Sequence, residues 1–319
     1  MTGDGYLLGI DTSNYTTSVA ILDASGKLVA NLKRPLPVKE GERGLRQSDA
    51  LFHHTVNLPY LMEEVGKITA GQRLIAVGVS DKPRNVEGSY MPCFLAGVAA
   101  AESIRAVSGV PLYRFSHQCG HVMAALFSSG RTDLASTSFA AFHVSGGTTE
   151  LVRVSGADGG FITELVGGTR DLNAGQVVDR IGVAIGLKFP AGAELEKLAL
   201  TNTKRLPRRR VSRDGLFLNL SGLENIAIKL YRDTDDRALV AAFVLDYIAR
   251  ALDELSDEYR EQYGECEMVY AGGVMSNSII KKYISERRAA LFAEPAMSAD
   301  NAVGVAMLAY EKCKSEKIF

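Results

Sequence analysis

The chain opens each of its halves with the same pattern, and this repeat constrains the fold more than any other feature. An apolar run is followed by a hydroxyl-rich loop and two further β-forming runs, first over residues 6–32 and again over residues 139–166. A match of this length could arise by chance, but its position at the start of each half favours duplicated architecture. The matching loops are Ser13-x-x-Thr16-Thr17-x-Val19 and Ser145-x-x-Thr148-Thr149-x-Leu151.

Strand and helix patterns alternate after each opening, which predicts an α/β chain with two mixed sheets covered by helices. Pro59 is expected to kink or split the first helix. The polar segment 128–137 is a plausible junction, so we expect domains over residues 1–130 and 131–319. The expected helices cover residues 46–65, 91–107, 117–126, 173–185, 194–200, 237–263, 277–288 and 301–314.

Composition narrows the class of protein. Hydrophobic residues make up 46% and charged residues 23% of the chain, as in an ordinary globular protein. The net charge of −1 gives no global attraction to nucleic acid, although a local basic patch could supply one. No apolar run approaches the ~18 residues of a membrane span, and no signal-peptide pattern is present. The four scattered cysteines suggest reduced thiols, so we expect a cytoplasmic location without a membrane partner.

Two of the five histidines, His117 and His121, lie four residues apart at the start of an expected helix. This spacing puts both imidazoles on one face, one turn apart, where they could share a metal ion. The alternative is a polar pair at a helix start with Ser116 as the cap. Cys119 faces away from such a site and is expected to pack. Asp300 precedes the last helix and could cap it or complete a two-histidine, one-carboxylate site.

Three loops could bind a nucleotide. In the second half a glycine-bearing loop could bring backbone N–H groups up to an anion, and a plain hairpin turn fits equally well. The first-half loop, Asp11–Asn14, could hold phosphate or contact a metal or water through Asp11, or form a polar turn. Asn277 follows a glycine pair and could bond a ribose or base, or cap a helix. The residues of the glycine-bearing loop are Val144, Ser145, Gly146, Gly147 and Thr148.

Taken in order along nearly the whole chain, several motifs resemble the tRNA N6-threonylcarbamoyladenosine synthases, the TsaD type formerly called glycoproteases. The resemblance implies the duplicated fold of actin, hexokinase and heat-shock ATPases (ASKHA), with two mixed-sheet halves around a nucleotide-binding cleft. The motifs are Gly9-Ile10-Asp11-Thr12-Ser13, His117-x3-His121, Val144-Ser145-Gly146-Gly147-Thr148, Asp179-Arg180 with Gly186 to Ala199, Leu220-Ser221-Gly222-Leu223, Ala271-Gly272-Gly273-Val274-x-x-Asn277 and Asp300-Asn301-Ala302.

The resemblance also implies a role for individual residues. His117, His121 and Asp300 would ligate one iron or zinc ion, and the loop 144–148 would cradle phosphate. The nucleotide would be ATP or threonylcarbamoyl-adenylate, from which threonylcarbamoyl passes to N6 of adenosine 37 in tRNAs that read codons beginning with A. A TsaB-like partner subunit is a further expectation. The residues expected to hold the nucleoside are Asp179, Gly192, Glu196 and Asn277, with Asp179 and Glu196 at the ribose hydroxyls.

Some segments depart from the family's usual residues. The family's first loop reads Thr-Ser-Cys-Asp-Glu-Thr, whereas this chain lacks the acidic pair that contributes to activity. A transferase with Asp11 and Ser13 as catalytic residues is one hypothesis. A divergent metal- and nucleotide-binding paralogue is the second, acting as a non-catalytic partner subunit or on another acceptor. The departures are Thr12-Ser13-Asn14-Tyr15-Thr16-Thr17, Thr148 for the histidine of Ser-Gly-Gly-His, and Glu224 for the lysine of Ser-Gly-Leu-Lys.

The most basic stretch of the chain, Lys204–Arg213, holds one lysine and five arginines. It could contact tRNA phosphates, or it could be a solvated loop. The old glycoprotease activity is the least favoured reading, because no His-Glu-x-x-His helix is present.

Overall fold

The computed structural model describes residues 5–13, 15–37, 45–298 and 300–318, and it divides into two compact units. Unit 1 comprises residues 1–137, 155–163 and 299–319, and unit 2 comprises residues 138–154 and 164–298. The sequence-based division put residues 155–163 and 299–319 with the second half. They group with unit 1 because the C-terminal helix packs on the first sheet and its Lys312 side chain donates to the Asp158 carbonyl at 2.6 Å.

Unit 1 is built on a five-stranded mixed sheet in the order β3-β2-β1-β4-β5. Strands β1, β4 and β5 are parallel, and β2 and β3 pair antiparallel beside them. Its elements are β1 (Gly5–Asp11), β2 (Thr16–Asp23), β3 (Leu28–Pro35), α1 (Gln47–Ile68), β4 (Arg73–Lys82), α2 (Phe94–Ser108), β5 (Leu112–Ser116), α3 (His117–Ser128), the 3-10 helix η1 (Thr132–Ser136) and α10 (Val303–Ser315).

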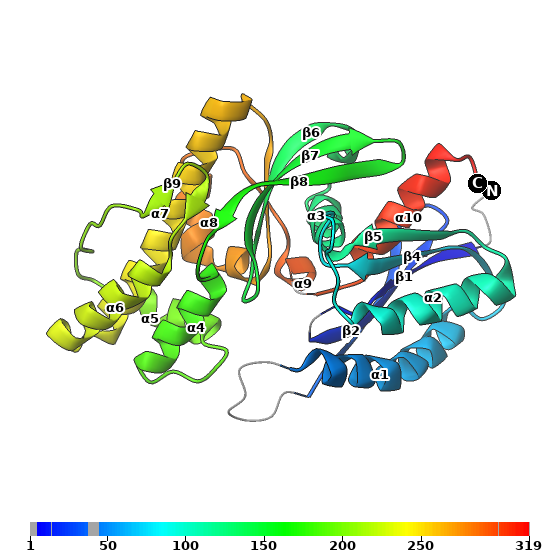
Figure 1. Cartoon of the computed structure of the whole chain (residues 1–319), viewed down its shortest axis with the longest axis horizontal. Helices are drawn as coiled ribbons and strands as arrows, with labels where there is room; N and C mark the ends of the chain where they lie inside the picture. The colour runs from blue at the N-terminus through cyan, green and yellow to red at the C-terminus, as the bar shows by residue number, and fades with distance from the viewer. Residues whose placement is uncertain (1–4, 14, 38–44, 299, 319) are drawn as a thin grey trace. The chain divides into compact units, whose positions relative to one another are not determined.

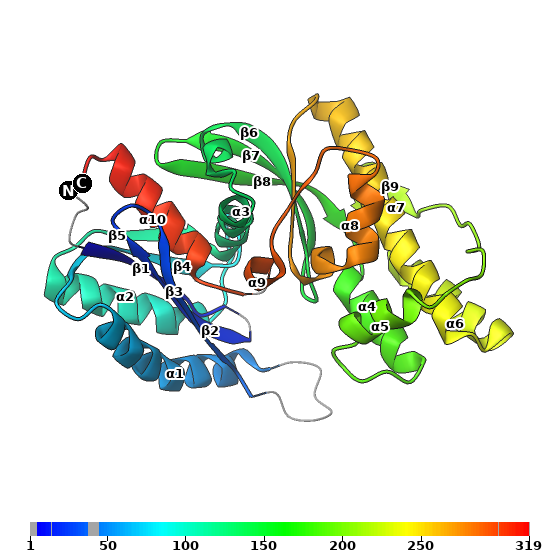
Figure 2. The same ribbon diagram turned by 180° about the vertical axis from the view of Figure 1, so that it is seen from behind.

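Helices cover both faces of this sheet, with α1 and α2 on one and α10 on the other (Figures 1 and 2). Ile10 and Val19 pack with Leu58 of α1 on the first face. Gly9 meets α10 on the opposite face, where an added Cβ would lie 2.4 Å from the Ala302 carbonyl oxygen. Glycine in β1 therefore lets α10 approach the sheet backbone closely.

Pro59 lies inside α1 without splitting it, since the helix runs unbroken from Gln47 to Ile68. The expected split is therefore wrong. Buried Leu58 and Leu61 lie on either side of the proline and pack against the sheet. Their packing holds the helix continuous where one backbone hydrogen bond is lost.

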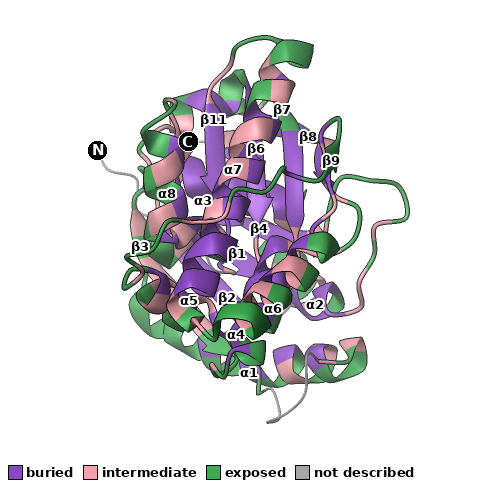
Figure 3. Ribbon diagram, turned by 90° about the vertical axis from the view of Figure 1, so that its left-hand side faces the viewer, coloured by how far each residue is buried: buried purple, intermediate pink, exposed green. Residues whose placement is uncertain are grey.

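Unit 2 carries a seven-stranded sheet in the order β12-β11-β6-β7-β8-β10-β9, in which β6 and β11 are buried along almost their whole length (Figure 3). The tip of the β7–β8 hairpin, residues 155–163, is counted with unit 1. The elements are β6 (Ser138–Val144), β7 (Thr149–Ala157), β8 (Gly160–Thr169), α4 (Ala174–Ala184), α5 (Gly192–Ala199), β9 (Arg213–Asp214), β10 (Phe217–Leu218), α6 (Ser221–Thr234), α7 (Arg237–Tyr263), β11 (Met268–Ala271), the 3-10 helix η2 (Gly273–Ser276), α8 (Ser278–Ser285), β12 (Leu291–Phe292) and α9 (Pro295–Ser298).

The two sheets repeat one topology. The order β3-β2-β1-β4-β5 in unit 1 corresponds to β8-β7-β6-β11-β12 in unit 2, with the first strand of each set central. The first strand also pairs in parallel with the fourth in both cases, as β1 with β4 and β6 with β11. This correspondence confirms the duplicated architecture expected from the repeated loops.

Helix α7 is the centre of the unit 2 core. It is buried along most of its length and packs against α4, α5, α6 and α8. Helix α6 was not expected from the sequence, where Ser221–Leu223 stood out only as a motif. Its apolar residues Leu223, Ile226, Ala227 and Leu230 recur at helical spacing and pack in or against the unit 2 core, a periodicity that the sequence analysis overlooked. Among the residues that the structure describes, no helix is long and apolar enough to cross a bilayer.

Candidate metal centre and ligand-binding loops

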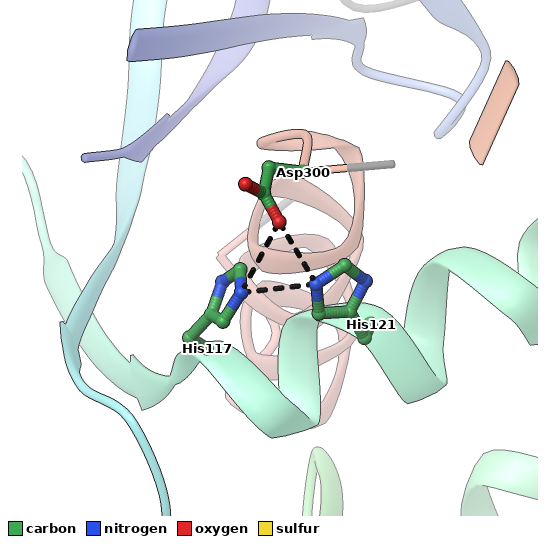
Figure 4. A group of neighbouring side chains, drawn as sticks. All are labelled: His117, His121 and Asp300. Atoms are coloured by element: carbon green, nitrogen blue, oxygen red, sulfur yellow. Dashed lines mark hydrogen bonds and ion pairs between the residues drawn. The ribbon is translucent and has the colours of Figure 1, made fainter. Parts of the chain in front are cut away.

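Helix α3 presents the two histidines side by side. It begins directly after β5, and the Ser116 hydroxyl caps it by accepting a hydrogen bond from the Cys119 backbone N–H at 3.2 Å. His117 and His121 are one turn apart on the same face, with their Nε2 atoms 2.9 Å apart (Figure 4). Cys119 is buried away from them and contacts Asn85 and Thr163 through its sulfur.

Asp300 completes a triangle of ligand atoms. Its Oδ1 lies 3.6 Å from His117 Nε2 and 3.4 Å from His121 Nε2 (Figure 4). The helix-capping alternative is not observed, because the side chain that bonds the first turn of α10 is Asn301, which accepts from the Val303 N–H at 3.0 Å. Asp300 thus meets two histidines that lie at least 179 positions earlier in the chain.

This donor set fits a metal ion. All three ligand atoms lie within 4.8 Å of one another. Two ligands bound about 2.0–2.1 Å from one ion, at angles of about 90–110°, are separated by roughly 2.9–3.4 Å. The observed separations of 2.9, 3.4 and 3.6 Å approach that range. Two histidines and one carboxylate suit iron or zinc, with further positions open to a substrate.

Asp11 supports the centre from behind. Its Oδ2 lies 2.7 Å from His117 Nδ1, and its Oδ1 accepts a hydrogen bond from the Ser13 N–H at 2.7 Å. The carboxylate is fully buried. A carboxylate that accepts a hydrogen bond from the ring nitrogen not used for the metal fixes the orientation and the tautomer of a metal-binding histidine. Its contacts here position His117, and the catalytic role expected for Asp11 stays a prediction.

Strand topology explains why Asp11 meets His117. Both residues stand at the carboxyl ends of parallel strands, Asp11 as the last residue of β1 and His117 as the first residue after β5. Carboxyl ends of parallel strands share one edge of the sheet, where binding residues of α/β folds gather. The pairing of β1 and β5 with the intervening β4 could not be read from the spacing of the two residues.

The charges of these groups are strongly coupled. Burial alone would lower the pKa of His117, but the Asp11 carboxylate and Asp300 outweigh it and raise the pKa to about 10. Burial likewise opposes ionisation of Asp11 and Asp300, yet His117 lowers the pKa of both carboxyls, and His121 also lowers that of Asp300. The pKa of His121 is lowered by its burial and by the neighbouring His117 charge. The cluster is therefore an anionic pocket around ring nitrogens, which suits a cation.

Lys33 is a neighbouring group that sequence reasoning missed. It pairs in register with Ser18 of β2, which in turn pairs with Asp11 of β1, so the three residues form one row across the sheet. Burial lowers the pKa of Lys33, and the nearby Asp300 carboxylate opposes that change. Alternation along β3 could have predicted its face, but its distance from Asp300 depends on where the chain returns.

The first loop is only partly described, since Asn14 lies outside the described residues. Ser13 is 1% exposed, and its hydroxyl oxygen has no hydrogen-bond partner among the described residues. Tyr15 follows at 39% exposure. A buried hydroxyl without a partner is unusual, and a ligand is one way to satisfy it.

The glycine-bearing loop of unit 2 lies between β6 and β7. The Ser145 N–H donates to the Thr148 carbonyl at 2.7 Å, and the Gly147 N–H donates to the Ser145 hydroxyl at 3.3 Å. Gly146 and Gly147 are exposed, and a Cβ added to either would meet nothing within 4 Å. Their backbone is therefore open to an approaching ligand.

Two further glycines hold this loop, Gly272 of the glycine pair noted in the sequence and Gly175, which the sequence analysis did not single out. A Cβ on Gly175 of α4 would lie 2.5 Å from the Ser145 carbonyl oxygen. A Cβ on Gly272, which has φ +98°, would lie 2.4 Å from the Val144 carbonyl oxygen. The first turn of α4 is thus adjacent to the loop, and its N–H groups are already bonded, that of Ala174 to the Thr149 hydroxyl at 2.8 Å and that of Gly175 to the Ser145 carbonyl at 3.2 Å.

The expected nucleoside residues form two hydrogen-bonded groups in unit 2. Asp179 of α4 accepts from the Ala191 N–H at 2.7 Å, next to Gly192 at the start of α5, and burial raises the pKa of its carboxyl. Glu196 of α5 accepts from the Asn277 amide at 3.1 Å and from the Ser278 N–H at 2.8 Å. Asn277 also caps α8, as its alternative interpretation expected.

Comparison with known proteins shows the family. A family model described as TsaD, tRNA N6-adenosine threonylcarbamoyltransferase, matches residues 42–307. The enzyme of that name from Streptococcus mutans is 32% identical over 297 residues, which cover 89% of this chain and 84% of the relative. The Streptococcus agalactiae enzyme is 31% identical over 300 residues, covering 88% and 84%. The chain belongs to the TsaD family. Its relatives are tRNA-modifying transferases.

Solved structures show the fold. HypF from T. kodakarensis aligns with 98% of this chain and 48% of its own length, at a TM-score of 0.64 and 13% identity. A ROK family glucokinase from Streptomyces griseus, solved with glucose and AMPPNP, aligns with 96% of this chain and 99% of its own, at a TM-score of 0.53 and 12% identity. These likenesses confirm the ASKHA-type fold expected for the TsaD family.

Proposed function

We propose that this TsaD-family chain is a metal-dependent transferase that moves threonylcarbamoyl from its adenylate to N6 of adenosine 37 in tRNA. The observation that carries the proposal is the triangle of His117, His121 and Asp300, with Asp11 held against His117. A chain that had kept only a scaffold role would have no evident need of a buried ligand set with its supporting acid. Because tRNA is the acceptor, we expect the reaction in the cytoplasm.

The residues of unit 1 would hold one iron or zinc ion. When bound, such a cation supplies positive charge that stabilises charge developing on a leaving phosphate. Asp11 holds His117 with Nε2 turned toward His121 and Asp300, where this nitrogen, once deprotonated, would act as a ligand. Ser13, tied to Asp11 through its N–H, offers its partnerless hydroxyl beside this carboxylate.

The residues of unit 2 would bind the nucleotide, either ATP or threonylcarbamoyl-adenylate. The exposed Gly146 N–H would donate to a phosphate oxygen, and the Gly147 N–H would do so by exchanging its 3.3 Å bond to the Ser145 hydroxyl. Glu196 and Asp179 would accept hydrogen bonds from ribose hydroxyls. In the present structure both carboxylates are engaged by backbone N–H groups, which holds them in position for a ligand.

Reconstitution tests this function. Purified protein would be assayed for bound metal and then supplied with threonine, bicarbonate, ATP, the adenylate-forming enzyme, a TsaB-like partner and unmodified tRNA. We expect modified adenosine in the digested tRNA by mass spectrometry. Metal and nucleotide bound without transfer, with the partner present, would contradict the proposal and favour the non-catalytic paralogue. The family's acidic pair is replaced here by Tyr15 and Thr16, and this replacement is the feature that favours the non-catalytic paralogue.

A further inference from the structure

A basic segment, defined as residues 204–213, crosses the surface of unit 2 between α5 and β9. Lys204 pairs with Asp236 at 2.7 Å, and Arg213 pairs with Glu254 and Glu258. The remaining four guanidinium groups are exposed and form no ion pair or side-chain hydrogen bond with any described residue. These four arginines are Arg205, Arg208, Arg209 and Arg210.

Unpaired arginines are not the rule in this unit. Elsewhere in unit 2, exposed or half-buried arginines commonly bond a neighbouring acid. Arginine is favoured wherever phosphate is recognised, since its planar group donates two parallel hydrogen bonds. Four such groups within six residues concentrate positive charge on a chain whose net charge is −1. The paired arginines are Arg170, Arg180, Arg250, Arg260, Arg287 and Arg288.

The backbone that carries these arginines is fixed by α7. The Arg250 guanidinium donates to the Arg209 carbonyl at 2.8 Å, and the Ser212 N–H donates to the Tyr247 hydroxyl at 2.8 Å. Between them Val211 is 3% exposed and packs in the core of unit 2. The segment has no regular secondary structure, yet its main chain is anchored while its charges face solvent. A fixed main chain lowers the entropy lost when a ligand binds.

Beside the arginines runs a groove of about 490 Å³. Four apolar residues line it, and Arg205 and Arg208 line it as well. The apolar residues are Leu206, Pro207, Leu230 and Leu239. A simple anion site needs no apolar lining. A nucleotide needs both a cation and an apolar surface, because its phosphate pairs with the cation while its base stacks on or packs against the apolar surface.

We propose that the basic segment is an RNA-binding surface that contacts the phosphate backbone of the tRNA substrate and receives one unstacked base in the groove. The identity of the RNA as tRNA rests on the proposed function. The unpaired charges, the anchored backbone and the apolar groove do not depend on it. An acidic segment of a protein partner would satisfy the charges but would leave the apolar groove without a matching group.

The test is tRNA binding by the variant Arg208→Gln/Arg209→Gln/Arg210→Gln. A transcript of a tRNA that reads a codon beginning with A is titrated with protein over a range of salt concentrations. We expect the Kd to rise about tenfold to a hundredfold. The slope of log Kd against log salt should become shallower by about 2 to 3, because about one phosphate contact is lost per arginine. ATP affinity and the thermal midpoint should stay at wild-type values.

A matched control removes the same charge elsewhere. Lys27→Gln/Lys67→Gln/Arg105→Gln replaces three exposed cations of unit 1, and it should leave tRNA affinity within about twofold of wild type. A polyphosphate competitor of equal charge addresses the groove. It should displace tRNA less effectively than a single-stranded RNA oligonucleotide, and equal competition would overturn the assignment of the groove to a base.

The result separates this inference from the proposed function. Loss of tRNA binding in the triple variant supports the RNA surface even if neither protein transfers threonylcarbamoyl. In a protein that does transfer, the variant should show a raised KM for tRNA with kcat unchanged. Equal tRNA affinity in the variant and the wild type would overturn the inference, whatever the transfer assay gives, and would leave an acidic protein partner as the occupant.

Discussion

The loops that follow the first strand of each unit start from one residue pattern and end in opposite environments. In unit 1, Asp11 and Ser13 are buried, and Asp11 is committed to His117. In unit 2, the aligned loop is exposed at Gly146 and Gly147 and offers backbone N–H groups rather than side chains. The shared topology decides where each loop lies, and the residues within it decide whether it supports a metal ligand or faces an anion.

The largest expected effect comes from breaking the triangle that the unit 1 loop supports. His121→Ala removes a ligand. The rate of transfer to tRNA should therefore fall more than it does when a residue that only supports a ligand is replaced, which typically costs about 10- to 100-fold. The rate of modified adenosine formation measures this. Asp158→Ala, which removes an exposed acid from the same unit, is the control and should keep wild-type activity. Wild-type activity in His121→Ala would rule out a role for the centre.

The next effect tests the unit 1 loop itself. Asp11→Asn keeps the size of the side chain and an acceptor for the Ser13 N–H, but it removes the charge beside His117. Metal affinity, measured by competition with a chelator, should weaken about 10- to 100-fold. Asp23→Asn alters another acid at a strand end of unit 1 and should leave affinity unchanged. Equal affinity in both variants would show that Asp11 does not position the ligand.

The unit 2 loop should respond to bulk rather than to charge. Gly147→Val adds a side chain where no atom lies within 4 Å, so the fold should tolerate it within about 0.5 kcal/mol. Nucleotide affinity should fall about tenfold, because the side chain would stand between ligand and backbone. Gly175→Ala should leave nucleotide affinity nearly unchanged in the folded protein but lower the free energy of unfolding by about 1–3 kcal/mol. Calorimetry of ATP binding and thermal melts separate the two, and unaltered ATP binding by Gly147→Val would refute the exposed-donor role.

The smallest effect concerns the groups around the nucleoside residues of unit 2. Asn277→Ala loses the cap of α8, worth about 1 kcal/mol, together with the amide that bonds Glu196. Asn277→Ser keeps a capping oxygen and loses only the amide. We expect a lowered thermal midpoint for the alanine variant alone and weakened adenosine binding for both. Normal adenosine binding by the serine variant would leave Asn277 with a capping role only.

Local pattern was enough to predict much of the fold. The duplicated opening loops predicted two related sheets, and the strand orders bear this out. The split allowed for at Pro59 was wrong, because the flanking core residues of α1 keep the helix continuous. Membership of the units was also beyond the sequence, because α10 is far along the chain and returns to the sheet of unit 1.

The candidate site divides in the same way. The spacing of His117 and His121 on one helix was enough to predict that they lie side by side, since four residues make about one turn. The sequence left Asp300 as a helix cap or a third ligand, and the family resemblance favoured the ligand. Its place in the triangle depends on the return of the chain to unit 1. The support of His117 by Asp11 and the row that carries Lys33 both depend on strand pairing, which residue spacing does not encode.

The most direct test of the central claim is calorimetric titration of zinc into metal-free protein, wild type beside Asp300→Ala. We expect about one zinc per chain for the wild type, and for the variant an affinity weakened by more than about a hundredfold. Zinc binding by Asp300→Ala with wild-type stoichiometry and affinity would contradict the account, because the metal would then lie outside the His117, His121 and Asp300 triangle.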